Sequence, residues 1–233
     1  MSTRRTAETT PTMPAVRNRA VSPTGVVPLV LGAVISAVLL LLTPWGERNE
    51  IGYAAVAPIR DAFWAGILLD GLATVAVTLG LSSVVLRLVQ STGAVPARLG
   101  AVLAVAGGVI FALGGFGYAT LAWHLTDPTI LDPAACTAVL HSAIENPQHS
   151  LLVQIVGFLA MTLGVMLLSI ALLRSGMLPQ WLPIAVLSTS VLAFVVPPRG
   201  KDLIQVLQLL ALVAIGLLAL QVTREVTAAI ESR

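Results

Sequence analysis

Charge is the scarcest feature of this sequence, because Asp, Glu, Lys and Arg together make up 10% of its 233 residues. An average soluble globular protein has about one quarter charged residues. Hydrophobic residues reach 57% here, and the mean hydropathy is +0.93. So few charges cannot cover the surface of a soluble domain, and we therefore expect the lipid bilayer to surround most of the chain.

Cysteine and motifs of known chemistry are also scarce. The single cysteine, Cys136, excludes an internal disulfide and a CxxC metal or redox site. The chain has no GxxxxGKS or GxxxxGKT phosphate loop, no HExxH or GxSxG motif and no paired aspartates. We therefore expect no cofactor and no metal, and we favour a protein that is not an enzyme. The basic residues form no stripe with interleaved aromatics, so nucleic acid is not an expected partner.

Six long apolar runs organise the rest of the chain. Each has about 20 or more residues, enough for an α-helix to cross a hydrocarbon core of roughly 30 Å. None shows the alternating pattern of barrel strands, so helix is the expected form. The predicted fold is an all-α integral-membrane bundle of six helices, with runs at Val26–Trp45, Ala62–Leu86, Leu99–Trp123, Leu151–Leu173, Met177–Val196 and Leu203–Val222.

The distribution of basic residues predicts the orientation of these helices. A cytoplasmic N-terminus places nine basic residues inside and four outside, as the positive-inside rule requires. Both termini are therefore expected in the cytoplasm. We divide the chain into a disordered cytoplasmic tail (1–24), a six-helix transmembrane domain (25–223) and a cytoplasmic C-terminal tail (224–233).

The long outer loop between the third and fourth helices, Leu125–His149, carries signals for one more helix. Asp132 and Pro133 form an N-cap followed by a proline at the first helical position, and Asn146-Pro147 ends the segment. We expect a short amphipathic helix near the outer membrane interface. Its expected apolar face consists of Ala134, Ala135, Val139, Leu140, Ala143 and Ile144. We expect Cys136 and His141 on its surface.

The two short inner connections share the pattern Gly-x-x-Pro-x-x-Leu, which starts at Gly93 and again at Gly176. The pattern has two interpretations. It reflects a duplicated pair of helices, or it reflects the general preference for glycine at helix ends and proline at helix starts.

The segment ALLRSGMLPQWLPIAVL (Ala171–Leu187) spans the second of these connections. It resembles a recurrent segment of a bacterial integral-membrane family catalogued only as a domain of unknown function, with a Leu-Pro-x-Trp-Leu-like inner turn. The resemblance implies a multi-pass protein of the bacterial plasma membrane. It implies no activity, substrate or catalytic residue.

Asp70 interrupts the second apolar run, in the stretch WAGILLDGLATV (Trp64–Val75). At 1.5 Å per residue it lies roughly 12 Å below the outer edge of the helix, not far from the midplane. A carboxylate there costs about 2.5–3.5 kcal/mol unless it faces protein, water or a partner, so we expect Asp70 to face the bundle interior. Its expected partners are polar residues of the outer half, namely Thr74, Gln154, Gln205 and Gln208.

These polar residues have two interpretations. In the first, Asp70 is the floor of an outward-facing pocket that binds a small polar or cationic ligand or relays a proton. The mouth of that pocket consists of His124, His149, Arg199 and Lys201. In the second, Asp70 and the glutamines only hold helices together, at about 0.6 kcal/mol per hydrogen bond. A haem on the two histidines is not expected, because b-type haem ligands usually lie on helices within the bilayer, and a metal is not expected, because the spacing provides no third ligand.

Small residues line one side of the third helix at spacings of three or four, at Ala104, Gly108, Ala112, Gly115 and Ala119. Small residues let helices approach closely in lipid. Close packing on this side makes the third helix the central one of the bundle. The same glycine-rich helix is the expected contact with another membrane protein or a second copy of the chain.

Three functional hypotheses remain open. The first is a binding or accessory subunit of a membrane complex, with tight packing and a shallow outer pocket. The second is a small transporter or proton-coupled carrier that uses Asp70, which requires polar residues in both halves of the bundle and helix breaks near the midplane. The third is a membrane enzyme that acts on a lipid at the outer leaflet. The prolines lie near helix ends and the inner half has few ionisable groups, which favours the first.

Overall fold

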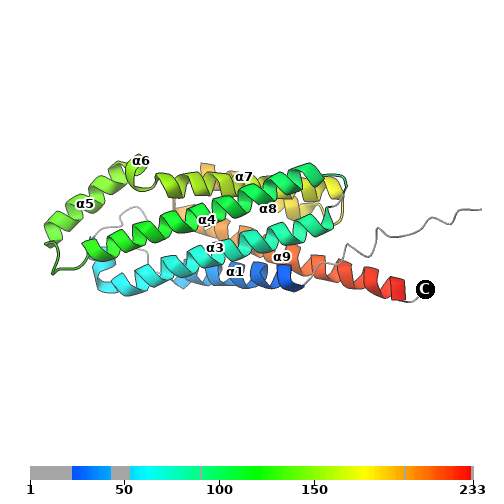
Figure 1. The fold of residues 1–233 in the computed structure, drawn as a ribbon, viewed down its shortest axis with the longest axis horizontal. Helices are drawn as coiled ribbons and strands as arrows, with labels where there is room; N and C mark the ends of the chain where they lie inside the picture. Colours follow the sequence, from blue (N-terminus) through cyan, green and yellow to red (C-terminus); the bar gives the residue numbers. More distant parts are fainter. Residues whose placement is uncertain (1–22, 43–52, 90, 197, 232–233) are drawn as a thin grey trace, which may run out of the picture.

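The computed structural model describes residues 23–42, 53–89, 91–196 and 198–231, which form an all-helical bundle without a strand. Its long helices run side by side (Figure 1). Among the described residues, five segments are long and apolar enough to cross a membrane. They are Thr24–Leu41, Tyr53–Leu88, Ala94–Leu125, Leu152–Ser175 and Gly200–Val222.

The described elements follow one another in the order predicted, with additional short helices. Their bounds are α1 Pro23–Leu42, α2 Tyr53–Val56, the 3₁₀ turn η2 Ala57–Ile59, α3 Arg60–Leu88, α4 Ala94–Leu125, α5 Pro133–Glu145, α6 Pro147–Ser150, α7 Leu152–Ser175, α8 Trp181–Val195 and α9 Pro198–Glu231. The predicted N-terminal tail lies outside the described residues, apart from its last two residues, which begin α1.

The bundle has two different ends (Figure 1). At the end called here the cap end, α2, η2, α5 and α6 cover the long helices. At the opposite end, called the turn end, short connections join α3 to α4 and α7 to α8. The start of α1 and the end of α9 also lie at the turn end.

The fifth predicted span is shorter than expected. The run Met177–Val196 was expected to be helical throughout, but α8 begins only at Trp181 and has 15 residues, about 22 Å of helix. Gly176 ends α7 in a left-handed conformation with φ +62°, so the chain must turn before α8 starts. In contrast, α9 continues without a break to Glu231, past the predicted start of the tail at residue 224.

One large apolar core fills the bundle, and α3 lies at its centre. This core includes Leu29, Leu81, Leu168, Leu182 and Ile215, one from each of five different helices. α3 packs against α1, α4, α7 and α9, whereas α4 packs mainly against α3 and α7. The prediction that the helix Leu99–Trp123 is central is therefore wrong. Its small residues pack against two neighbouring helices, α3 and α7, rather than against all the helices of the bundle.

The packing of α4 against α7 is the closest in the described bundle. A Cβ added at Gly107 would overlap the backbone nitrogen of Met161, and one at Gly164 would overlap that of Ala104. A second small face of α4 meets α3, where Gly108 lies against Thr78. Close packing of the predicted small residues is thus confirmed. The face formed by Gly100, Gly107 and Gly114 was missed.

A second, smaller apolar core lies at the cap end. It joins Val56, Phe63, Ala122, Cys136 and Leu140, so α5 is attached to α2 and to the adjoining ends of α3 and α4. A helix at the predicted position and its Asp132 cap are confirmed, since the Asp132 carboxylate accepts hydrogen bonds from the backbone N–H groups of Ala134 and Ala135 at 2.8 and 3.1 Å.

The buried face of α5 differs from the predicted one. Cys136 was expected at the surface but is 0% exposed, and Leu140 lies one turn further along the same buried side. Val139 was expected on the apolar face but is 44% exposed. His141 is exposed, as expected, and pairs with Glu145 at 3.1 Å. The face was misassigned because alanines at 134, 135, 138 and 143 extend the apolar residues of α5 around more than one side of the helix.

Candidate functional site

Asp70 lies on α3 and is half-buried. Its Oδ1 accepts a hydrogen bond of 2.8 Å from the hydroxyl of Ser36 on α1, which is 4% exposed. Glycines bring these two helices together, because a Cβ at Gly32 would lie 2.6 Å from the carbonyl oxygen of Ala73. Ser36 is one turn beyond Gly32, and Asp70 is about one turn before Ala73. The small residues therefore place the hydroxyl against the carboxylate.

The predicted glutamines lie in three different environments. Gln208 on α9 is half-buried and donates a 3.0 Å hydrogen bond to Ser190 on α8. Gln154 on α7 lies against α4, where its Nε2 is 3.6 Å from the position that a Cβ on Gly115 would take. Gln205 is exposed. The hydrogen bond of Gln208 therefore joins α9 to α8 rather than to α3, and the two glutamines of α9 do not share a buried face.

The predicted pocket mouth is distributed over the cap end. His124 is exposed at the end of α4, with its ring 5.0 Å from that of Trp123 in an edge-to-face arrangement. His149 is exposed on α6, and Lys201 is exposed at the start of α9. The side chain of Arg199 lies outside the described residues. Within the described part of the chain, no three His, Cys, Asp or Glu residues gather as they would to bind a metal ion.

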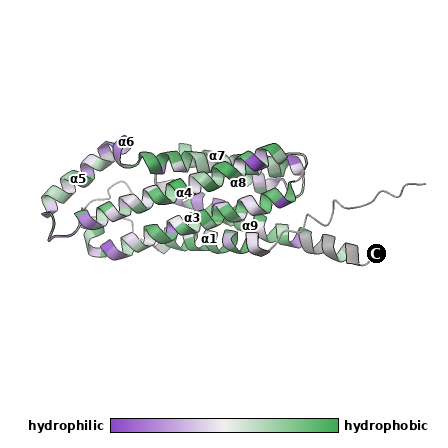
Figure 2. Ribbon diagram, viewed as in Figure 1, coloured by the Kyte–Doolittle hydropathy of each residue, from purple (hydrophilic) through white to green (hydrophobic). Residues whose placement is uncertain are grey.

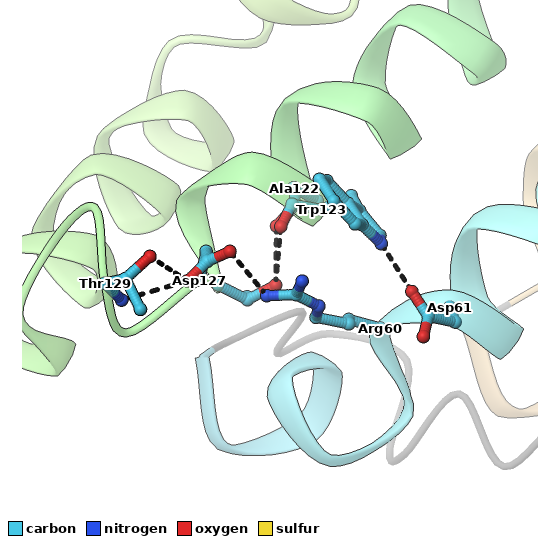
Figure 3. Close-up of polar contacts among 7 residues, drawn as sticks. Arg60, Asp61, Ala122, Trp123, Asp127 and Thr129 are labelled. Atoms are coloured by element: carbon cyan, nitrogen blue, oxygen red, sulfur yellow. Dashed lines mark hydrogen bonds and ion pairs between the residues drawn. The ribbon is translucent and has the colours of Figure 1, made fainter.

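A polar cluster at the cap end was not predicted (Figure 3). The guanidinium group of Arg60, at the start of α3, lies 4.3 Å from the centre of the Trp123 ring. It also pairs with Asp127 at 3.1 Å. The indole N–H of Trp123 donates a 2.6 Å hydrogen bond to Asp61. These four residues, called here the cap clamp, join the start of α3 to the end of α4 and the following loop.

Asp127 completes the cap clamp through a local turn. Its Oδ1 accepts hydrogen bonds from both the hydroxyl and the backbone N–H of Thr129, at 2.7 and 2.9 Å (Figure 3). These bonds, together with that from Arg60, lower the pKa of the Asp127 carboxyl from 3.8 to about 2. Asp127 therefore remains ionised, and the pair with Arg60 persists, throughout the neutral and mildly acidic range.

The two polar sites have different chemical capacities. In the cap clamp, the charges of Arg60 and Asp127 compensate each other and the groups fix helix ends. At the other site, the Asp70 carboxylate accepts a hydrogen bond from the neutral hydroxyl of Ser36, so an ionisable group meets an uncharged partner inside the bundle. Two sequence signals were available for these contacts: an isolated serine within an apolar run, and opposite charges at neighbouring helix ends.

No known protein family, curated protein or solved structure matches this chain. The resemblance of Ala171–Leu187 to a bacterial membrane family therefore stays a prediction. What the described residues define is the class: an α-helical bundle with several helices compatible with crossing a membrane.

Proposed function

We propose that the protein is a six-pass protein of the plasma membrane that acts as a binding or accessory subunit of a membrane complex. In this proposal α8 is the fifth of the six passes, in addition to the five longer spans, and both termini are cytoplasmic. The turn end then faces the cytoplasm and the cap end faces outward, with α5 at the outer interface. The excess of arginine near the turn end supports this orientation.

The observation that carries the proposal is the half-buried Asp70 carboxylate paired with Ser36 in an otherwise apolar bundle. Ionisable groups inside membrane segments are costly and usually functional. Asp70 lies 17 residues before Arg87, which is about 26 Å along α3. If Arg87 marks the inner boundary of a core of roughly 30 Å, Asp70 lies near the outer boundary, closer to the outer surface than the sequence suggested.

The packing around this site favours binding over transport. Glycines of α4 and α7 meet the opposite backbone directly, so these two helices are packed as closely as their backbones allow. The cap clamp and the second apolar core also hold the cap end as a preformed surface. A closely packed bundle with the half-buried Asp70 carboxylate and a fixed outer surface suits a subunit that recognises a partner at its outer end.

The size of the native assembly tests this proposal. Mildly solubilised membranes of the source organism should contain the tagged protein in a larger particle than the purified chain, as judged by native electrophoresis. We expect Asp70→Asn to reduce the amount of that larger particle. Val139→Ala changes an exposed residue of α5 at the cap end and should leave the amount unchanged. Migration of the wild-type protein at the size of the purified chain, also after crosslinking, contradicts the proposal.

A second candidate function is a proton-coupled carrier, and it rests on a different observation. Polar residues recur every four positions along α3, at Asp70, Thr74, Thr78 and Ser82. The hydroxyl oxygen of Ser82 is buried without a hydrogen-bond partner among the described residues. Proteoliposomes that contain a pH-sensitive dye distinguish this function, since a carrier acidifies the lumen under an imposed potential and Asp70→Asn does not. The third candidate, an enzyme for outer-leaflet lipids, has the Ser36 hydroxyl beside Asp70, but the three histidines lie at the end of α4 and on α5 and α6, rather than on α1 or α3.

A further inference from the structure

Three arginines occupy the turn end of the bundle. Arg87 lies in the last turn of α3, Arg98 near the start of α4, and Arg174 in the last turn of α7. All three are exposed. We call them the arginine triad. Figure 2 shows hydrophilic positions around the two connections at this end, next to long hydrophobic helices.

The folded chain brings the two connections together. Gly93 precedes α4 with φ +95°, and a Cβ there would lie 3.0 Å from the carbonyl oxygen of Ala171 on α7. The connection between α3 and α4 therefore packs on the end of α7. Residues far apart in the sequence, such as Arg87 and Arg174, thereby belong to one surface.

Acidic residues are absent from the stretches of sequence that carry these three arginines. The sequence contains no Asp or Glu between Asp70 and Asp127, nor between Glu145 and Asp202. The acidic residues Glu225 and Glu231 belong to the part of α9 that follows its apolar span, which ends at Val222. The arginine triad is therefore a cationic surface directly beside apolar helix faces.

We infer that the arginine triad binds the headgroups of anionic phospholipids in the inner leaflet. Arginine suits this ligand because its planar guanidinium group donates two parallel hydrogen bonds to a phosphate. The neighbouring Trp181, at the start of α8, is 62% exposed, and indole rings favour the level of lipid headgroups. The inference rests on the cytoplasmic orientation of the turn end that is part of the proposed function, but not on any role of Asp70.

Lipid titration of the purified full-length protein tests the inference. In neutral detergent, the thermal unfolding midpoint should rise as dioleoyl phosphatidylglycerol is added and should not rise with dioleoyl phosphatidylcholine. A basic residue near an anionic membrane surface contributes about fivefold in affinity. Arg98→Gln alone should therefore raise the half-saturating lipid fraction about fivefold, and the triple Gln variant should raise it about 100-fold.

Two controls keep the result specific. Lys201→Gln removes one positive charge at the opposite end, where Lys201 is exposed, and should leave the titration unchanged. Sodium phosphate at matched ionic strength should not reproduce the rise, because the ligand is a headgroup held beside the apolar faces. If the triple variant does not fold, the single variants decide, since each keeps most of the inner positive charge.

Three outcomes overturn the inference: an equal rise with phosphatidylcholine, an unchanged half-saturation in the arginine variants, or a full response to inorganic phosphate. The last outcome indicates a site for free anions rather than for lipid.

Discussion

The hydroxyl of Ser36 on α1 donates a 2.8 Å hydrogen bond to the carboxylate of Asp70 on α3. The two residues are 34 positions apart and belong to neighbouring antiparallel helices. Glycines on both helices set the short distance, since a Cβ on Gly80 would lie 2.6 Å from the backbone nitrogen of Leu29. The ionisable group of the α3 span is therefore positioned by the first helix of the bundle.

Ser36→Ala should weaken the junction of α1 and α3. Hydrogen bonds between membrane helices contribute about 0.6 kcal/mol on average and up to about 1.7. For a chain of this size we expect the unfolding midpoint in detergent to fall by about 1–5 °C. Asp70→Asn keeps an acceptor oxygen for Ser36 and should cost less than Asp70→Leu. Equal midpoints for wild type and Ser36→Ala would show that this bond contributes nothing to stability.

Gly107→Ala should separate α4 from α7, because the added methyl group would overlap the backbone nitrogen of Met161. Overpacking of this kind costs about 1–3 kcal/mol, which thermal unfolding in detergent measures. The matched control is Gly117→Ala on the same helix, where an added Cβ meets nothing within 4 Å. That change should be neutral or stabilising, because alanine favours helix by about 1 kcal/mol over glycine. The reverse order of the two variants contradicts the packing described here.

Asp127→Asn should reduce stability only where Asp127 is ionised. The pKa of Asp127 is about 2 in the folded protein, below its ordinary value of 3.8. The stability that the charge contributes is therefore fully present above about pH 4 and is lost as the pH falls towards 2. Unfolding midpoints of wild type and variant, measured from pH 2 to 6, should converge at the acidic end.

Thr129→Val provides a check on the cause of that pKa shift. The hydroxyl of Thr129 donates the bond that lowers the Asp127 pKa most. In Thr129→Val, the stabilisation that the Asp127 charge provides should therefore be lost at a higher pH than in the wild-type protein. An unchanged pH profile in Thr129→Val would mean that another group holds the Asp127 charge.

Cys136 should react slowly with maleimide in the folded protein. Its side chain is fully buried in the second apolar core, and this burial raises the pKa of the thiol, so little reactive thiolate is present. Val139→Cys places a thiol on the exposed side of the same helix and should react much faster. Comparable rates for the two thiols, in a protein shown to be folded, would contradict the docking of α5.

The elements of the fold were largely predictable, because the length of an apolar run and the residues that start and end a helix are local properties of the sequence. The cap of α5 followed from Asp132 and Pro133, and the long helices followed from runs of apolar residues. The start of α8 did not, because the conformation of Gly176 delays the helix until Trp181. The repeated Gly-x-x-Pro-x-x-Leu pattern was misleading in one respect: its leucines differ, with Leu99 57% exposed and Leu182 0% exposed.

The candidate site was predictable only in its main residue. An aspartate within an apolar run is conspicuous in any sequence, and Asp70 needed no further information. Its partner Ser36 and the cap clamp were missed because each contact joins residues from separate helices. Which residues meet depends on helix rotation and on the depth at which two helices pack, and neither quantity is encoded in one segment.

By itself, the sequence determined that the chain is rich in long apolar helices, that it has too few charges for a soluble domain, and that Asp70 is its exceptional residue. Only the tertiary structure decided that α3 is central, that Cys136 is buried and that the arginines of the turn end share one surface. The physical reason is that apolar length is a sum over neighbouring residues, whereas burial and pairing depend on which helix faces meet. In this bundle, glycines that let two backbones touch determine which helix faces meet.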